Sequence, residues 1–368
     1  MNTDGEPNDE SRQVMTQGRP RSVALQRQAR AAVLWAIGVL VLGQAFLRYG
    51  IDHLWPELRD PAFEIKARRL RQVIAQSPRP PVTVLMFGSS VARNIFRAEY
   101  LEEQLSRELN RPAAVMNMSC VGAGPLTELV WTRRLLDRGV RPDFVCVEVT
   151  PFLYNTPGPP FDAPRFPEHL LTEADLEIVE RYSGDAELRH KWSQFRWFPA
   201  YEHRLTIVNC LSESLVPIQD RVPTWRDSKD QRFWAALPSP SAEQLQATLV
   251  NVKGMFESQL RYFAPGEPSI HALEELLALL HREGIPTAVI LAPVGPTVRK
   301  LYPKEPLDRF VQQVIQLSDR YSCRYLDAFD WLGEDMFGDS IHATAEGADV
   351  FSNRLAREVL LPALAAPQ

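Results

Sequence analysis

The segment PVTVLMFGSSVARNIF, residues 81–96, decides the fold. Its first part, Val82–Phe87, is a short apolar run of the kind that forms a buried strand. Gly88 permits a tight turn, and a helical pattern begins just after Ser89 and Ser90. A serine between a strand and a helix lies close to free backbone N–H groups. It is therefore a candidate nucleophile, although serine is also an ordinary helix cap.

A carboxylate and an imidazole near the other end of the chain complement this serine. The segment DSIHATAEG begins at Asp339 and places His342 three residues later, on a loop before the last predicted helix. This spacing lets Asp339 hold one ring nitrogen of His342 while the other nitrogen faces a serine hydroxyl. The sequence therefore predicts a catalytic relay of Ser90, His342 and Asp339.

Three blocks of the sequence resemble the SGNH/GDSL hydrolase superfamily. FGSSV resembles the GDSL block, with Ser90 at the nucleophile position, and DSIHATAEGA resembles the closing DxxH block. Asn117–Gly124 resembles the second block, which implies that the N–H groups of Gly122 and Ser90 form an oxyanion hole. The resemblance covers roughly residues 80–155 and 280–362. It implies a serine hydrolase fold and activity.

The third block of that superfamily, GxND, is altered here. The strand predicted over Phe144–Val149 continues into TPFLYN, with no asparagine at the expected place. Asn155 and Thr150 are the candidates for the missing oxyanion donor, and Ser89 stands where the superfamily often has aspartate. Since one oxyanion donor contributes ~2.7–4 kcal/mol to transition-state stabilisation, the change implies either a different oxyanion hole or a weakened catalyst.

Composition narrows the classes of function. The chain has 368 residues, 45% of them hydrophobic, which is ample for a globular core. A net charge of −5 gives no indication of nucleic-acid binding. Its four cysteines show no metal-ligand spacing. We therefore expect no metal, no cofactor and no disulfide.

The N-terminal region predicts a membrane anchor. Residues 1–30 are polar and predict a disordered cytoplasmic tail. Ala31–Leu47 is an uncharged run of 17 residues, at the short end of the ~17–25 that span a bilayer. Residues 31–48 are thus interpreted as a transmembrane signal anchor, with a cleaved signal peptide or a buried core helix as alternatives. Arginines before the run and acids after it place the N-terminus in the cytoplasm and the remainder outside; residues 49–80 are predicted to form a helical stalk.

From Pro81 onward strands and helices alternate, which predicts an α/β fold: three α/β/α layers around a parallel, flavodoxin-like sheet. The expected strands are 82–87, 114–118, 144–149, 287–291 and 324–326; the expected helices are 99–109, 126–136, 270–282, 307–321 and a last one ending near 361. This domain comprises 81–155 and 266–364. Residues 156–265 form a helical, aromatic-rich insert, either a subdomain with its own core or a lid over the serine.

These patterns favour a membrane-anchored serine esterase or O-acyltransferase facing the cell envelope. Its partner would be an acylated small molecule or glycan, as envelope-anchored members of the resembled superfamily imply. Arg93 and Asn94, just after the candidate nucleophile, are candidate substrate contacts, although an exposed helix turn explains them equally well. The alternatives are an SGNH-like binding or assembly protein without chemistry, and a cytoplasmic esterase with a buried N-terminal helix.

Overall fold

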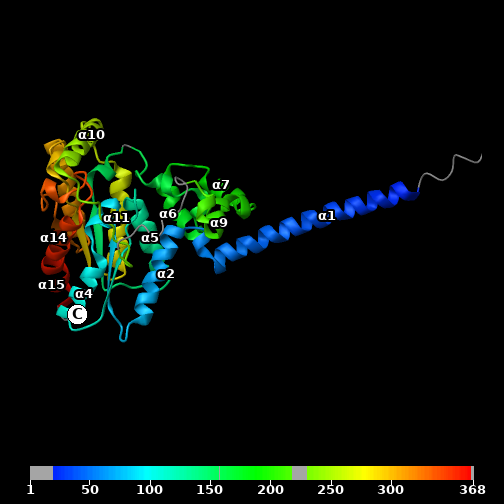
Figure 1. Ribbon diagram of the computed structural model, residues 1–368, viewed down its shortest axis with the longest axis horizontal. Coiled ribbons are helices and arrows are strands. Elements are labelled where there is room, and N and C mark those ends of the chain that lie inside the picture. The colour runs from blue at the N-terminus through cyan, green and yellow to red at the C-terminus, as the bar shows by residue number, and fades with distance from the viewer. Residues whose placement is uncertain (1–19, 157, 218–229, 366–368) are drawn as a thin grey trace, which may run out of the picture.

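A computed structural model describes residues 20–156, 158–217 and 230–365. Five parallel strands form one sheet in the order β2-β1-β3-β4-β5 (Figure 1). They are β1 (Val82–Phe87), β2 (Ala113–Asn117), β3 (Phe144–Val149), β4 (Thr287–Leu291) and β5 (Arg324–Asp327). Every residue of β1 to β4 is buried, as expected of a parallel sheet covered on both faces. The predicted α/β class is confirmed.

Helices cover the sheet in two layers. Helix α5 packs against α11 and α11 against α13, whereas α14 packs against α3. The bounds of the body helices are α3 (Ser90–Ile95), α4 (Ala98–Glu108), α5 (Pro125–Asp137), α11 (Glu267–Arg282), α12 (Pro296–Arg299), α13 (Lys304–Arg320), α14 (Ala345–Leu355) and α15 (Leu361–Ala365). The helices predicted in this domain are therefore present, with ends shifted by a few residues.

The strand order fixes where a ligand can bind. The chain leaves β1 for β2 on one side and then crosses to β3 on the other side of β1. The crevice between the carboxyl ends of β1 and β3 is therefore the topological switch point, where parallel α/β sheets bind ligands. Ser90 follows β1, and Glu148 is the penultimate residue of β3. The candidate nucleophile therefore lies at the expected edge of the sheet.

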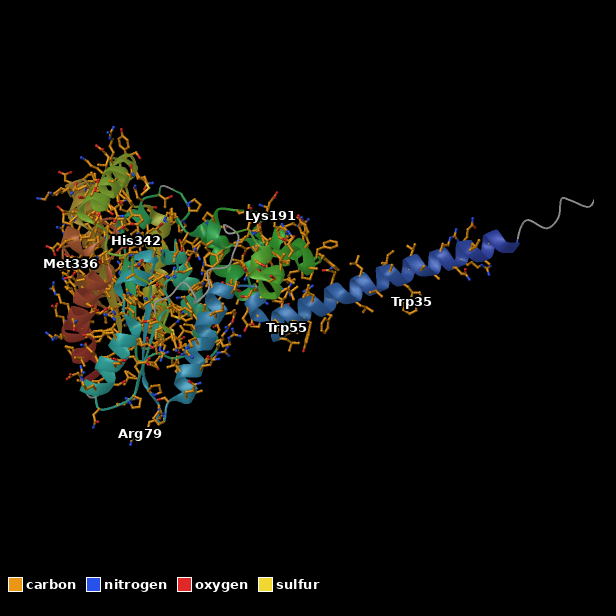
Figure 2. All side chains as sticks on the ribbon, viewed as in Figure 1. Trp35, Trp55, Arg79, Lys191, Met336 and His342 are labelled. Atoms are coloured by element: carbon orange, nitrogen blue, oxygen red, sulfur yellow. The ribbon has the colours of Figure 1, made fainter. Side chains whose placement is uncertain are left out.

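The N-terminal helix α1 (Pro20–Tyr49) extends away from the body, and Trp35 projects from it (Figures 1 and 2). The helical segment Val23–Leu54 is long and apolar enough to cross a membrane, and none of its most apolar window is buried. The predicted disordered tail is wrong for residues 20–30, which are helical. Their Ala, Leu, Gln and Arg residues are good helix formers that extend an existing helix at little cost. Residues 1–19 lie outside the described residues.

The segment after α1 is not a free stalk. A π-helical turn (Gly50–Leu54) and a short 3₁₀ turn (Pro56–Leu58) lead into α2 (Pro61–Gln76). Helix α2 buries a face that includes Phe63, Ala67 and Leu70 and packs against β2. Phe63, Ala67 and Leu70 share one helix face because they are four and three residues apart. Helix α2 is therefore part of the body, and residues 61–76 do not form the stalk that the sequence predicted.

The insert is helical, as expected. Its helices are α6 (Glu173–Ser183), α7 (Leu188–Phe195), α8 (Pro199–Glu202), α9 (Arg204–Leu211) and α10 (Ala242–Leu260). Capping boxes start two of them: Thr172 with Asp175 begins α6, and Ser241 with Gln244 begins α10, each satisfying two first-turn N–H groups. Trp225, one of the insert's aromatics, lies outside the described residues.

A buried arginine on α5 joins three parts of the chain. The guanidinium of Arg134 donates to Asp60, ahead of α2, at 2.6 Å, and to Asp175 on α6 at 2.9 Å. It also donates to the carbonyl of Leu170 at 3.0 Å. All three charged side chains are less than 10% exposed. Burial alone would raise the pKa of Asp175, but Arg134 and the N-cap hydrogen bonds lower it below its ordinary value.

We predict that Arg134→Leu destabilises the protein by about 3–5 kcal/mol, because it leaves two buried carboxylates without their cation. Neighbouring Arg133 pairs with Asp137 on the exposed face of the same helix, so Arg133→Leu should change the free energy of unfolding by no more than ~0.5 kcal/mol. Urea denaturation of the full chain in detergent measures both. Equal losses in the two variants would contradict this account.

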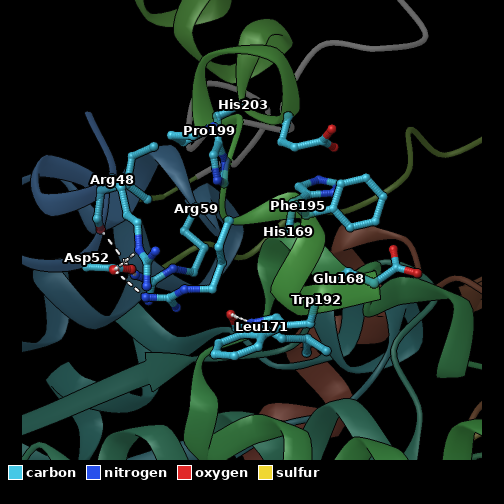
Figure 3. A pocket seen from close by; sticks show the side chains of 13 residues that line it. Arg48, Asp52, Arg59, Glu168, His169, Leu171, Trp192, Phe195, Pro199 and His203 are labelled. Atoms are coloured by element: carbon cyan, nitrogen blue, oxygen red, sulfur yellow. Dashed lines mark hydrogen bonds and ion pairs between the residues drawn. The ribbon is translucent and has the colours of Figure 1, made fainter. Parts of the chain in front are cut away.

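The end of α1 is fastened to the insert by a second set of contacts, shown in Figure 3. Asp52 accepts hydrogen bonds from Arg59 and, at 2.9 Å, from Arg196. On the same cavity His203 approaches the carbonyl of Leu58 through Nδ1 at 2.9 Å. Burial, and then the positive charge of nearby His169, lower the pKa of His203 to about 4.

We predict that His203 makes folding sensitive to acid. Between its ordinary pKa of about 6.5 and its folded value near 4, the unfolded chain binds a proton that the folded chain does not, so stability falls as pH drops across this window, by up to ~3 kcal/mol. His203→Gln should remove that slope, measured as the free energy of unfolding between about pH 7 and about pH 4. His190→Gln, at an exposed position on α7, is the control. An unchanged slope in His203→Gln would refute the assignment.

Candidate active site

The structure brings Ser90, His342 and Asp339 together. His342 Nε2 lies 2.8 Å from Ser90 Oγ, and His342 Nδ1 lies 2.8 Å from Asp339 Oδ2. The side chains of His342 and Asp339 are 27% and 23% exposed, so the relay meets solvent at one end. This geometry lets the imidazole take a proton from the serine hydroxyl while the carboxylate fixes its tautomer.

The loop that carries Asp339 and His342 is shaped by its own backbone. Asp339 Oδ1 accepts the N–H groups of Ile341 at 3.0 Å and His342 at 2.7 Å. Ser340, which follows Asp339, has φ +65°, in the left-handed region that residues other than glycine rarely adopt. Burial alone would raise the pKa of Asp339, but the hydrogen bonds and charge of His342 and these backbone N–H groups lower it. The carboxylate is thereby kept ionised to orient the imidazole.

The first turn of α3 leaves one backbone donor unused. Ser89 Oγ accepts the N–H of Val91 at 3.0 Å, and a carboxylate oxygen of Glu148 accepts the N–H of Ala92 at 2.8 Å. Within the described part of the chain, the N–H of Ser90 has no hydrogen-bond partner. A free N–H on the candidate nucleophile's own residue is the kind of donor that an oxyanion requires.

Glu148 holds the nucleophile turn in place, and sequence reasoning missed it. Its carboxylate accepts the N–H of Ser89 at 2.8 Å and the Ser89 hydroxyl at 2.9 Å, besides the Ala92 N–H and the Thr150 hydroxyl. Burial raises the pKa of Glu148, although these hydrogen bonds oppose the shift. Gly88 packs directly over it, since a Cβ there would lie 2.6 Å from the Glu148 Cβ. The signal available in the sequence was a lone charge inside the apolar strand FVCVEV.

Asn117, at the end of β2, is a second residue that the sequence did not reveal in this role. Its Nδ2 donates to the carbonyls of Ala92 and Phe96 at 3.2 and 3.1 Å. Its Oδ1 accepts the N–H of Ser119 at 3.1 Å. The fully buried amide therefore ties the C-terminal turn of α3 to the neighbouring strand.

Gly122 lies on the adjoining loop. The N–H of Cys120 donates to the carbonyl of Gly88 at 2.9 Å, and the N–H of Ala123 donates to the carbonyl of Cys120 at 2.9 Å. Gly122 occupies the third position of this turn with φ +68°, which glycine adopts without strain. Its N–H has no partner among the residues that the structure describes. The oxyanion role of Gly122 stays a prediction with this geometry in its favour.

The two candidates for a further oxyanion donor are engaged elsewhere. The Thr150 hydroxyl donates to Glu148. The Asn155 amide donates to the carbonyl of Gln259 at 2.8 Å and accepts the N–H of Ala264 at 2.7 Å. The prediction that either side chain completes the oxyanion hole therefore gains no support from the structure.

Residues 232–237 of the insert, which precede α10, form a strap beside this site. Its backbone bonds to β2 through the Arg232 carbonyl, to α3 through the Ala235 N–H, and to the histidine loop through the Leu237 N–H, at 3.2, 3.1 and 3.3 Å. Asn94 is buried beneath it and donates to the carbonyl of Ala235 at 2.6 Å. The predicted substrate contact of Asn94 therefore gains no support from the structure, because its amide anchors the strap; that of Arg93 stays a prediction.

We predict that Glu148→Gln slows the reaction of Ser90 with a fluorophosphonate by at least ~10-fold, because an amide offers one acceptor oxygen to four donors and an unpaired buried donor costs about 1–3 kcal/mol. Glu128 on α5 supplies the control. Burial, and then the charges of Glu148 and Asp162, raise its pKa well above the ordinary value, and within the described residues its carboxyl group makes no hydrogen bond to the turn that carries Ser90. Equal labelling rates in the two variants would contradict the positioning role of Glu148.

Comparisons with known proteins place this chain in a family without assigning an activity. No curated protein matches the sequence. An alpha/beta hydrolase, LAE5, from the metagenome of Lake Arreo, Spain, is 12% identical with a TM-score of 0.34 over 77% of this chain and 94% of its own. Axe2, an acetylxylan esterase from Geobacillus stearothermophilus, is 11% identical with a TM-score of 0.36 over 75% and 93%.

At such TM-scores these likenesses are too distant to bear on what the chain does. The family model "Protein of unknown function (DUF1574)" matches residues 45–346, which is most of the chain and includes the end of α1, the insert and the relay. The chain is a member of this DUF1574 family.

Proposed function

We propose that this protein is a serine esterase or O-acyltransferase that acts on an acyl ester. The observation that carries the proposal is the continuous relay from Asp339 through His342 to Ser90, with 2.8 Å at each step. It is strengthened by the free N–H groups of Ser90 and Gly122, which are the donors that an oxyanion requires. The resemblance of three sequence blocks to the SGNH/GDSL superfamily agrees with it.

The reaction would proceed through a covalent acyl-enzyme. Ser90 Oγ attacks the ester carbonyl as His342 Nε2 takes its proton, and Asp339 stabilises the resulting imidazolium. The carbonyl oxygen becomes an oxyanion beside the N–H groups of Ser90 and Gly122. Collapse of the tetrahedral intermediate breaks the ester bond, and His342 returns the proton to the departing alcohol.

The second half of the reaction decides between hydrolysis and transfer. Water attacking the acyl-enzyme gives an esterase, and a sugar hydroxyl gives an O-acyltransferase; the same relay serves both. We propose an acylated small molecule or envelope glycan as the substrate. Helix α1 would anchor the protein as a single span, with the N-terminus in the cytoplasm and the α/β body on the other side.

A second candidate function is a binding or assembly protein of the envelope that retains the fold with weak or no chemistry. One observation favours it: Thr150 and Asn155, the candidates for a further oxyanion donor, are both held by other contacts. A site with two oxyanion donors instead of three would lose ~2.7–4 kcal/mol of transition-state stabilisation.

We predict that the full-length protein in detergent is labelled by a fluorophosphonate probe. Ser90→Ala and His342→Ala should abolish labelling, because they remove the nucleophile and its base. Asp339→Asn should slow it by roughly 10²–10⁴-fold, since the imidazole loses its tautomer and its charge partner.

The controls are Ser258→Ala on α10 and His190→Ala on α7, both exposed and hydrogen-bonded to residues of their own helices. They should label as the parent does. Absence of labelling in the folded parent would refute the catalytic proposal and favour the binding protein. Labelling that survives Ser90→Ala would assign the nucleophile to another residue.

A further inference from the structure

The insert exposes an aromatic cluster, Trp197, Phe198 and Tyr201, at the foot of α1. These side chains are 71%, 60% and 62% exposed. Exposed leucines follow on and after α9: Leu205, Leu211 and Leu215. Single exposed apolar residues are common on soluble surfaces, but a concentration of large ones marks a surface that meets an apolar partner.

The aromatic cluster is fixed against the last turns of α1. The N–H of Ala200 on α8 donates to Gln44 Oε1 at 3.1 Å. Trp197 and Phe198 line a groove whose other wall includes Leu40 and Val41 of α1. The ion pair of Arg196 with Asp52 at 2.9 Å closes the same junction (Figure 3). The insert is therefore held beside the apolar helix and is not free to turn away from it.

The position along α1 gives the depth of the cluster. Leu40 lies seven residues before Leu47, the end of the uncharged run. At 1.5 Å per residue this is about 10 Å of helix. If α1 crosses a bilayer, side chains that share a groove with Leu40 lie at the boundary of acyl chains and headgroups. Amphipathic helices at membrane surfaces bury their apolar faces ≈ 5–10 Å deep at this boundary.

The chemistry of the cluster suits that boundary. Tryptophan and tyrosine concentrate where a membrane meets water, because each has an apolar ring and a polar group. The exposed Arg204 places its guanidinium 4.1 Å from the centre of the Tyr201 ring. A cation next to an aromatic belt can meet the phosphate of a lipid headgroup.

We propose that α8, with its Tyr201 and the preceding Trp197 and Phe198, docks into the surface of the phospholipid bilayer that α1 enters. The occupant of this face is lipid, since the cluster is continuous with the apolar surface of α1 itself. The inference rests on the anchoring role of α1 in the proposed function and is independent of the chemistry at Ser90.

The test uses the full chain in vesicles of phosphatidylcholine and phosphatidylglycerol, with an environment-sensitive fluorophore at a single introduced cysteine. Trp197→Cys, made together with Cys210→Ser to remove the exposed native thiol, reports on the cluster. The matched control is Tyr262→Cys in the same background. Tyr262 is 79% exposed and follows α10, a helix that lies on the side of the body away from α1 (Figure 1). The Cys210→Ser parent corrects for label on the other native cysteines.

Docking predicts that nitroxide-bearing lipids remove at least about half of the emission at position 197 and little at position 262. Equal, weak quenching at both positions, with protein that carbonate does not extract from the vesicles, would overturn docking but leave the proposed anchoring by α1 intact. Protein that does not float with the vesicles would overturn both. Emission from the label at position 197 could instead change with protein concentration and not with the lipid quencher. That result would overturn docking, because a second copy of the chain would then cover this face. Fluorophosphonate labelling of the same vesicles reports on Ser90 separately.

Discussion

The candidate active site depends on the hydrogen bonds that the buried carboxylate of Glu148 accepts. A buried carboxylate is costly unless donors surround it. This one receives the N–H and hydroxyl of Ser89 after β1, the N–H of Ala92 in α3 and the hydroxyl of Thr150 after β3. It thereby satisfies donors of the first turn of α3 and leaves the N–H of Ser90 free. Gly88 follows from the same constraint, because no Cβ fits over the carboxylate.

Residues of the insert, although distant in sequence, form hydrogen bonds with the loops and the helix of the candidate site. The strap at residues 232–237 touches the nucleophile helix on one side and the histidine loop on the other. Beside Gly122, Arg165 donates to the carbonyl of Val121 and, at 2.7 Å, to the Cys120 sulfur. The insert's aromatics are accordingly divided: Phe166 and Trp234 are buried against the body, whereas Trp197 and Phe198 face outward. Neither a subdomain with its own core nor a simple lid describes this arrangement.

The sequence predicted most of the sheet and the geometry of the relay, because both follow from local patterns. Val82–Phe87 and Phe144–Val149 are mostly apolar runs, and the spacing of Asp339 and His342 lets the carboxylate reach the imidazole within one turn. The supporting residues could not be predicted, because their partners are distant in the chain. Glu148 is 59 residues from Ser89, and Asn94 is 141 residues from Ala235. The same reason hid the role of α2, whose apolar stripe has meaning only beside β2.

The clasp of Arg134 has a consequence for where this protein can work. Its buried hydrogen bonds join the segment after α1, the α/β body and the insert, so α1 is tied to the body that carries the candidate site. If α1 spans a bilayer, Ser90 is held at a constant height and tilt above the lipid surface. Such a protein samples a thin layer parallel to the membrane and no deeper volume. Substrates confined to that layer meet the serine at a high effective concentration, whereas freely diffusing ones gain nothing from the attachment.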